Sequence, residues 1–177
     1  MQDSRGVALS LHHLGDIARR QNEHEQARAL YDRGLRILIE LGDRRAMANL
    51  LTDMGNMEGE RGDFAAARRL HEESMVIFSE LGDVRGIANL LEAIMRIAVA
   101  RGQLERALRL AGGASRLRED FQAPLPPDEA IELKQSLVSV RRQLGAASSD
   151  LAWQDGWAMR AEKAIQFALA AETDRVA

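Results

Sequence analysis

Four histidines are the side chains in this sequence with the broadest chemistry: His12, His13, His24 and His71. Imidazole binds transition metals and exchanges a proton near neutral pH. A zinc pair on one helix needs histidines four residues apart, usually with a third ligand. His12 and His13 are adjacent and would point in different directions on a helix. The spacing therefore predicts no metal site, and His71, which aligns with Tyr31 in the repeat described below, is expected to be a packing residue.

Other catalytic and cofactor-binding patterns are also missing from the sequence. It contains no cysteine, which excludes a thiolate nucleophile, a disulfide and a Cys-based zinc site. No serine stands in a Gly-x-Ser-x-Gly elbow, and no Gly-Lys-Ser or Gly-Lys-Thr could form a phosphate loop. Gly112 and Gly113 lie within a helical pattern, where small residues allow close packing. We therefore expect no enzymatic activity and no bound cofactor.

Composition limits the partners further. The 177 residues fit one domain, with an apolar fraction of 46% and a charged fraction of 29%, as in an ordinary globular protein. The net charge of −3 argues against nucleic-acid binding, which requires a basic face. No apolar run approaches the roughly 18 residues needed to span a membrane, and the first residues show no signal-peptide pattern. The sequence alone therefore indicates a cytoplasmic protein that contacts neither nucleic acid nor membrane.

A repeat with a period of forty residues organises the chain as far as about residue 120. The tripeptide Leu41-Gly42-Asp43 returns as Leu81-Gly82-Asp83, and the Ala-Asn-Leu-Leu run at 48–51 returns at 88–91. Internal repeats of this length are typical of helical solenoids. The matches define three copies, at about residues 5–42, 43–82 and 83–120.

Each copy predicts two helices. In the first copy, apolar and small residues recur at spacings of three and four over residues 5–20 and again over about 24–41. Glycine and asparagine adopt the left-handed conformation most readily, and they are predicted to end the helices at Asn22, Gly42, Gly62, Gly82 and Gly102. Asp43 and Asp83 are predicted to cap the helices that follow. No strand-like alternation occurs, so the predicted fold class is all-α.

The residues at the expected helix crossings resemble the tetratricopeptide-repeat motif. That motif places a Leu-Gly pair, an alanine and an aromatic residue at fixed offsets, and the first copy supplies Leu14-Gly15, Ala27 and Tyr31. The second copy carries Met54-Gly55 at the pair, and the third, the weakest, carries Ile94-Met95. The resemblance implies a tetratricopeptide-like α-α superhelix of three helical hairpins with a C-terminal helical cap.

In tetratricopeptide arrays the first helix of each pair lines a concave groove, and the resemblance implies such a groove here. The positions left after the packing stripe is assigned are the candidate partner-binding residues, namely His12, Asp16, Arg19, Asn49, Thr52, Asn56, Asn89, Glu92 and Arg96. Asn49 and Asn89 carry both hydrogen-bond donors and acceptors, which suits them to an extended peptide backbone. Arg19 and Arg96 are suited to gripping a carboxylate.

The period ends after residue 120, and the three prolines at positions 124, 126 and 127 predict a turn. Pro127 is predicted to open a new helix that ends near Gly145. A short helix capped by Ser148 or Ser149 and broken at Gly156 should follow, and then a last helix. We expect this segment to cover the open apolar end of the last repeat, so that residues 1–122 and the cap at 123–177 form one domain.

The C-terminal segment also resembles the end of large bacterial regulators of the LuxR type and related signal-transduction ATPases. The resemblance is carried by Leu110-Ala111-Gly112-Gly113-Ala114 and by Ala152-Trp153-x-x-Gly156-x-Ala158-Met159. Arg160 stands where that family places Ser or Thr before the last helix, so this helix should start less cleanly. No nucleotide-binding or DNA-binding domain is recognised in the sequence, so those activities are not implied.

These patterns together predict a protein–protein or peptide interaction module, the scaffold or sensor region of a bacterial regulatory protein. Two alternatives remain open. An apolar edge without an obvious cap at the N-terminal end could make the chain a self-associating structural module, including a homodimer. The groove could instead sense a small molecule.

Overall fold

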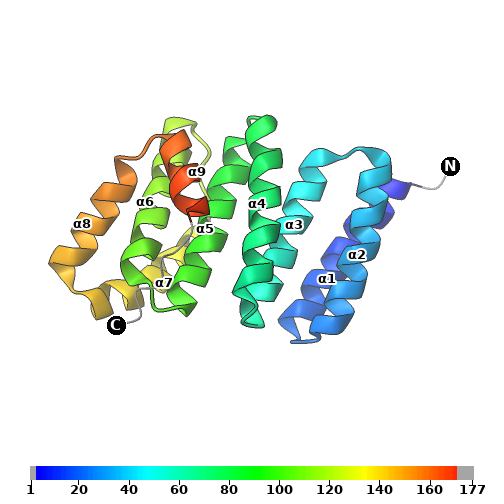
Figure 1. The fold of residues 1–177 in the computed structure, drawn as a ribbon, viewed down its shortest axis with the longest axis horizontal. Helices are drawn as coiled ribbons and strands as arrows, with labels where there is room; N and C mark the ends of the chain where they lie inside the picture. The colour runs from blue at the N-terminus through cyan, green and yellow to red at the C-terminus, as the bar shows by residue number, and fades with distance from the viewer. Residues whose placement is uncertain (1–2, 171–177) are drawn as a thin grey trace. The chain divides into compact units, whose positions relative to one another are not determined.

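The computed structural model describes residues 3–170, and the regular elements of that part are all α-helices (Figure 1). The first two pairs are α1 (Ser4–Arg20), α2 (His24–Leu41), α3 (Arg44–Glu60) and α4 (Phe64–Glu80). They are followed by α5 (Val84–Ala100), α6 (Leu104–Asp120), α7 (Pro127–Leu144), α8 (Ala146–Trp157) and α9 (Ala161–Leu169). The predicted all-α class, built of successive helical hairpins, is confirmed.

The turns between the first six helices share one geometry. The predicted helix ends are confirmed, because φ lies between 61° and 84° at Asn22, Gly42, Gly62, Gly82 and Gly102. After each left-handed residue the next N–H donates back into the helix, as Asp43 N does to Leu38 O at 3.1 Å. Gln122, with φ of 49°, is a sixth left-handed residue at the same spacing. Ala123 and three prolines between residues 124 and 127 come next, and the regular twenty-residue spacing of the helices ends there.

Aspartate side chains begin four of these helices. Asp43 accepts a hydrogen bond from Ala46 N at 3.2 Å and Asp83 one from Gly86 N at 3.1 Å, as predicted. Asp3 and Asp63 make the same bond at α1 and α4. Each carboxylate satisfies an N–H that has no partner inside its helix.

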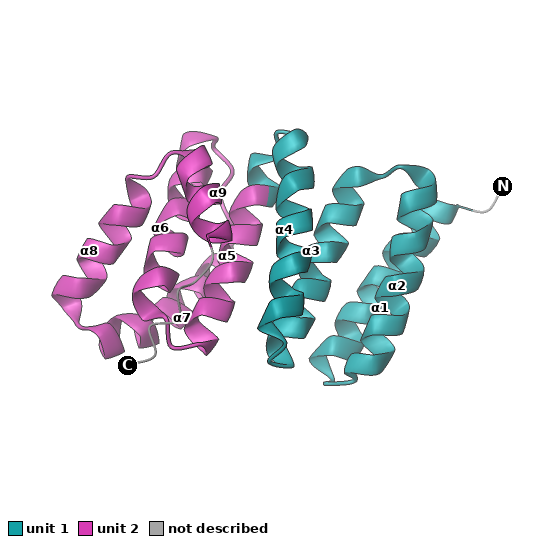
Figure 2. Ribbon diagram, viewed as in Figure 1, with its two compact units in different colours: residues 1–86 teal, residues 87–177 magenta. Residues whose placement is uncertain are grey.

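The chain divides into two compact units, residues 1–86 and 87–177 (Figure 2). This division groups residues that pack together, whereas the expected boundary after residue 122 marks the end of the repeat; that boundary stays a prediction. In the first unit, glycines let paired helices approach. A Cβ at Gly15 would lie 2.4 Å from the ring of Tyr31, and one at Gly55 would lie 2.4 Å from the ring of His71. The expectation that His71 is a packing residue is therefore confirmed.

In the second unit α6 and α8 are in backbone contact. A Cβ at Gly112 would lie 2.5 Å from Trp153 O, and one at Gly156 only 2.0 Å from Arg109 O. The expected packing role of Gly112 is confirmed. The predicted end of this helix at Gly156 is within one residue of the observed one, because α8 ends at Trp157. The packing role of Gly156 against α6 was not predicted.

The ends of the C-terminal helices were predicted unevenly. Pro127 opens α7 and Gly145, with φ of 84°, follows its end, as predicted. The predicted serine cap of α8 is wrong, because the helix starts at Ala146 and Ser149 is buried, with its hydroxyl donating to Arg141 O at 3.4 Å. Arg160 precedes α9 without a side-chain capping bond, as expected from its type. Within residues 3–170, no helix combines the length and hydrophobicity that crossing a membrane requires.

Candidate partner-binding site

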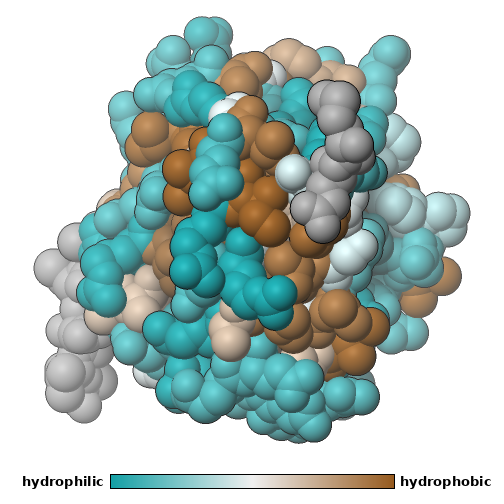
Figure 3. All heavy atoms as spheres, turned by 90° about the vertical axis from the view of Figure 1, so that its right-hand side faces the viewer, coloured by the Kyte–Doolittle hydropathy of each residue, from teal (hydrophilic) through white to brown (hydrophobic). Residues whose placement is uncertain are grey.

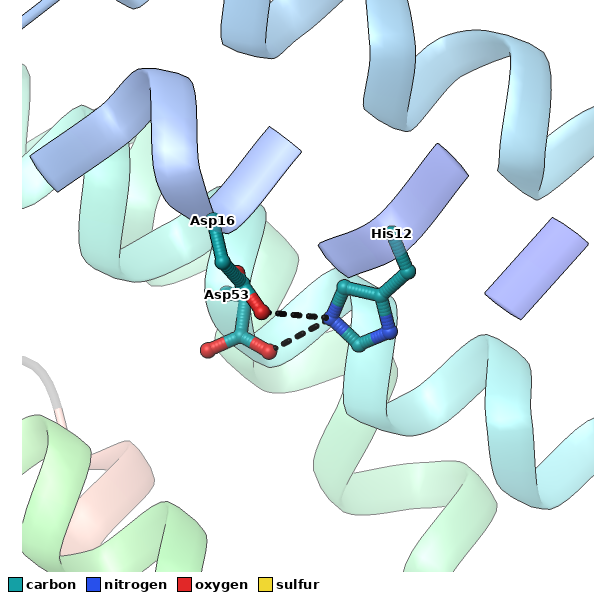
Figure 4. Close-up of side chains that lie close together, drawn as sticks. All are labelled: His12, Asp16 and Asp53. Carbon is teal, nitrogen blue, oxygen red and sulfur yellow. Dashed lines mark hydrogen bonds and ion pairs between the residues drawn. The ribbon is translucent and has the colours of Figure 1, made fainter. Parts of the chain in front are cut away.

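A polar cluster joins the first helices of the first two pairs. His12 and Asp16, one turn apart on α1, meet Asp53 of α3 (Figure 4). The Nε2 atom of His12 lies 2.8 Å from Oδ2 of Asp53 and 3.9 Å from Oδ2 of Asp16. One imidazole nitrogen is thus placed between two carboxylates that come from different helices.

The outer oxygens of both carboxylates have donors of their own. The hydroxyl of Tyr31, on α2, donates to Oδ1 of Asp16 at 2.7 Å. The amide of Asn56 donates to Oδ1 of Asp53 at 3.4 Å. These bonds orient each carboxylate so that its second oxygen faces His12, and they tie three helices into one network.

A second polar contact repeats the first one two turns further along. Arg19 of α1 forms an ion pair with Glu60 of α3, seven residues beyond His12 and Asp53 respectively. Because seven residues are about two helical turns, both contacts lie on the same side of α1. The two first helices are therefore bridged by polar side chains at two levels.

The surroundings favour the protonated form of His12. Burial alone would lower its pKa, but the hydrogen bond to Asp53 and the charges of Asp53 and Asp16 outweigh burial and the repulsion from Arg19. The pKa of His12 is therefore raised above 6.5. Burial and the bond to Asp16 raise the pKa of Tyr31 far above its ordinary range, so its hydroxyl stays a donor.

The cluster also has the geometry of a possible cation site. In the described part of the chain, His12, Asp16 and Asp53 each offer one ligand atom, and these atoms lie within 4.8 Å of one another. One imidazole nitrogen with carboxylate oxygens suits borderline divalent cations. The prediction from the sequence considered only pairs of histidines as ligands. It missed Asp53, which is separated from His12 by 41 positions. His12 already hydrogen-bonds Asp53 and forms an ion pair with Asp16, so these groups need no cation to be satisfied.

The remaining candidates of the first unit behave differently from one another. Asn49, one turn before Asp53, is exposed. Thr52 is half-buried, with its hydroxyl donating to Ala48 O at 3.0 Å and lying 2.8 Å from the hydroxyl of Ser74. Thr52 therefore takes part in the contact between α3 and α4, while Asn49 is open to solvent.

Two candidates of the second unit, Asn89 and Glu92, bond a buried arginine. Arg118 of α6, 7% exposed, donates to Glu92 through Nε at 2.9 Å, and its Nη2 bonds Asn89. Glu92 is 4% exposed, whereas Arg96 is exposed. Asn89 and Glu92 are thus engaged within their own unit.

Arg118 was missed by the sequence reasoning, although a signal existed. At shifts of forty and eighty residues it aligns with Phe78 and Leu38, each 1% exposed. A charged residue at a core position of the repeat predicts a buried partner of opposite charge, and Glu92 is that partner.

The family comparison identifies the helix pairs that carry the polar cluster. The chain matches the tetratricopeptide repeat family over residues 7–41 and 47–81. These two segments are tetratricopeptide repeats. They contain α2 and α4 entirely and most of α1 and α3, so the cluster of His12, Asp16 and Asp53 lies within them. Tetratricopeptide repeats generally mediate protein–protein interactions, and a protein-interaction module is therefore the general function supported here. No curated protein was found that matches the chain.

Proposed function

We propose that this tetratricopeptide-repeat protein binds an extended segment of a partner protein across α1 and α3. The binding surface, called the α1–α3 polar face below, consists of His12, Asp16, Arg19, Asn49, Asp53, Asn56 and Glu60. The observation that carries the proposal is the bonded network on the first helices of two tetratricopeptide repeats. Side chains that are already fixed lose little conformational freedom when a ligand binds.

The charges of this face suggest the chemistry of the partner. The carboxylates of Asp16, Asp53 and Glu60 outnumber the cationic groups of His12 and Arg19. Asn49 adds an exposed amide that can both donate to and accept from a peptide backbone. A peptide in extended conformation with a lysine or arginine side chain directed at Asp53 would match this surface.

A displayed peptide library tests the proposal. We expect the wild type to enrich extended peptides with a basic residue, and we expect Asn49→Ala combined with Asp53→Asn to bind them at least about tenfold more weakly, the equivalent of one lost charged contact. Arg36→Ala, at an exposed position of α2, is the matched control and should bind as the wild type does. Equal binding by the double variant would rule out the α1–α3 polar face.

We also propose a regulatory setting for this module. The C-terminal run that resembles LuxR-type regulators supports a scaffold or sensor role in a bacterial regulatory protein of the cytoplasm, without enzymatic activity of its own. The coding sequence around this chain tests the setting. A nucleotide-binding or helix-turn-helix region in the same reading frame would support it, and unrelated genes on both sides would count against it.

A further inference from the structure

Four positions on α1 form a regular stripe that the first unit leaves open. Val7, Ser10, Leu14 and Ile17 recur at spacings of three, four and three, the pattern of a and d positions in a coiled coil. We call these four residues the α1 seam. Val7 is 44% exposed, Leu14 51% and Ile17 53%. Figure 3 shows apolar side chains gathered on the face of the molecule to which α1 and α2 belong.

The next repeat shows what this stripe does when it is covered. Forty residues later the equivalent positions on α3 are Met47, Leu50, Met54 and Met57. Leu50 and Met57 are completely buried and Met54 is 8% exposed, because α2 and α1 pack against α3. The repeat therefore uses this stripe for contact between helices, and the α1 seam has the same spacing and apolar character.

Ser10 is the one polar member of the seam, and its hydroxyl is already satisfied. It donates to Gly6 O within α1 at 2.8 Å. A buried hydroxyl costs free energy mainly when it lacks a partner, so Ser10 can be covered at little cost. Its small size also leaves room for a large side chain opposite.

The order of residues in the seam makes it complementary to itself. In an antiparallel pair of α1 helices, Val7 of one copy lies opposite Ile17 of the other, and Ser10 lies opposite Leu14. Each layer then combines a smaller side chain with a larger one, as interdigitated packing requires. The flanking residues in the same register, Asp3 and Gln21, would meet as a polar pair at each end.

We propose that two copies of this protein associate through the α1 seam, with the two α1 helices antiparallel across a two-fold axis. Such a contact is isologous, because each copy contributes the same residues. A single pair of short helices buries less area than a standard interface, so the dimer is expected to dissociate in the range of tens of micromolar. On α1 the seam faces away from the side that carries His12, Asp16 and Arg19, which makes the dimer independent of the proposed peptide binding.

Sedimentation equilibrium of the full chain tests the association. The mass is expected to rise with concentration from 19.6 kDa towards twice that value. Leu14→Glu should weaken the dimer at least about tenfold, because two charges would be buried per dimer. Leu151→Glu, at a 60% exposed position on α8, is the matched control, and circular dichroism should show unchanged helix content in both variants. A wild type that stays monomeric at several hundred micromolar, or a dimer that Leu14→Glu leaves intact, would refute the proposal.

Disulfide trapping tests the antiparallel register, and the absence of natural cysteine makes it clean. A mixture of Val7→Cys and Ile17→Cys copies should give disulfide-linked dimers on mild oxidation, because these positions face each other. Each variant alone should remain unlinked, since its own cysteines would lie roughly 15 Å apart along the helices. Linking of either variant to itself would show a parallel pair and overturn the register. If the seam binds a helix of another protein and not a second copy, all three samples would stay unlinked.

Discussion

The first two helix pairs and the third pair solve the same packing problem with opposite choices of residue size. In α1–α2 and α3–α4 a glycine faces a ring, as Gly15 does Tyr31 and Gly55 does His71. At the equivalent positions the third pair has Met95 and Ala111, exposed by 1% and 0%. The large residue has moved from the second helix to the first. The repeat therefore conserves the volume that fills the crossing rather than the residue on either helix.

The second helix of the third pair also carries a surface of small residues. On α6, Ala111 is followed by Gly112 and Gly113, and α8 lies against this stretch with its backbone. The ring residues Tyr31 and His71 instead occupy α2 and α4. Gly112 stands where the first two pairs have Asp32 and Glu72, so a register shared by all three pairs supports a different neighbour once both side-chain size and charge are lost.

The largest effect on stability is expected from replacing Arg118, the buried arginine of the third pair. Arg118→Leu restores the kind of residue found at Leu38 but leaves Glu92 buried without its partner. We expect the free energy of unfolding to fall by about 3–5 kcal/mol, measured by urea denaturation.

A second substitution distinguishes lost charge pairing from lost packing. Arg118→Leu combined with Glu92→Met removes both charges, and most of the stability should return. If the double variant is as unstable as Arg118→Leu alone, the ion pair between Arg118 and Glu92 is not the cause.

The next effect compares glycines in the two units. Gly156→Ala would place a methyl group 2.0 Å from Arg109 O, and we expect a loss of about 3 kcal/mol because backbone must move. Gly34→Ala is the matched change in α2, where the added Cβ would lie 3.4 Å from Ala8 O. Its stability should change by less than about 1 kcal/mol, since helix propensity improves. Thermal denaturation of both variants checks the contrast, and equal losses would contradict it.

The smallest effect is on how stability depends on pH, a property that His71 has and that Tyr31, at the equivalent position of the first pair, lacks. Burial lowers the pKa of His71 to about 4 from 6.5, so the unfolded chain binds a proton more readily than the folded one. The stability that depends on neutral His71 is fully present above pH 6.5 and is lost as the pH falls towards 4. The free energy of unfolding is expected to fall by about 2 kcal/mol between pH 7 and pH 5 for this reason. His71→Phe should lose less stability over that range than the wild type, as urea unfolding at the two pH values would show.

A control histidine is available for that experiment. His13→Gln changes an exposed histidine of α1 and is the matched histidine substitution for that experiment. His12 contributes with the opposite sign, because its raised pKa stabilises the folded state at low pH and the effect is lost as the pH rises. A steeper acid loss in His71→Phe than in the wild type would contradict the assignment.

Local signals were the ones that the sequence made predictable. The left-handed residues from Asn22 to Gly102 and the cap at Asp43 depend on backbone preferences within a few residues, and all were predicted. The packing role of Gly156 was missed, because it depends on Arg109, 47 positions away. Two pairings were missed for the same reason, that of His12 with Asp53 and that of Glu92 with Arg118. The repeat period predicts which positions are equivalent, but not which side chains come into contact.

The six left-handed residues recur every 20 positions from Asn22 to Gln122, and this regularity bears on how the array can change in length. Gly42 is followed by Asp43 and Gly82 by Asp83, so a duplicated segment 43–82 would rejoin the chain through the same glycine–aspartate junction. Neither a helix end nor a cap would have to be rebuilt. The array is thus open to growth by whole copies through recombination, with each new pair entering in the register of the last.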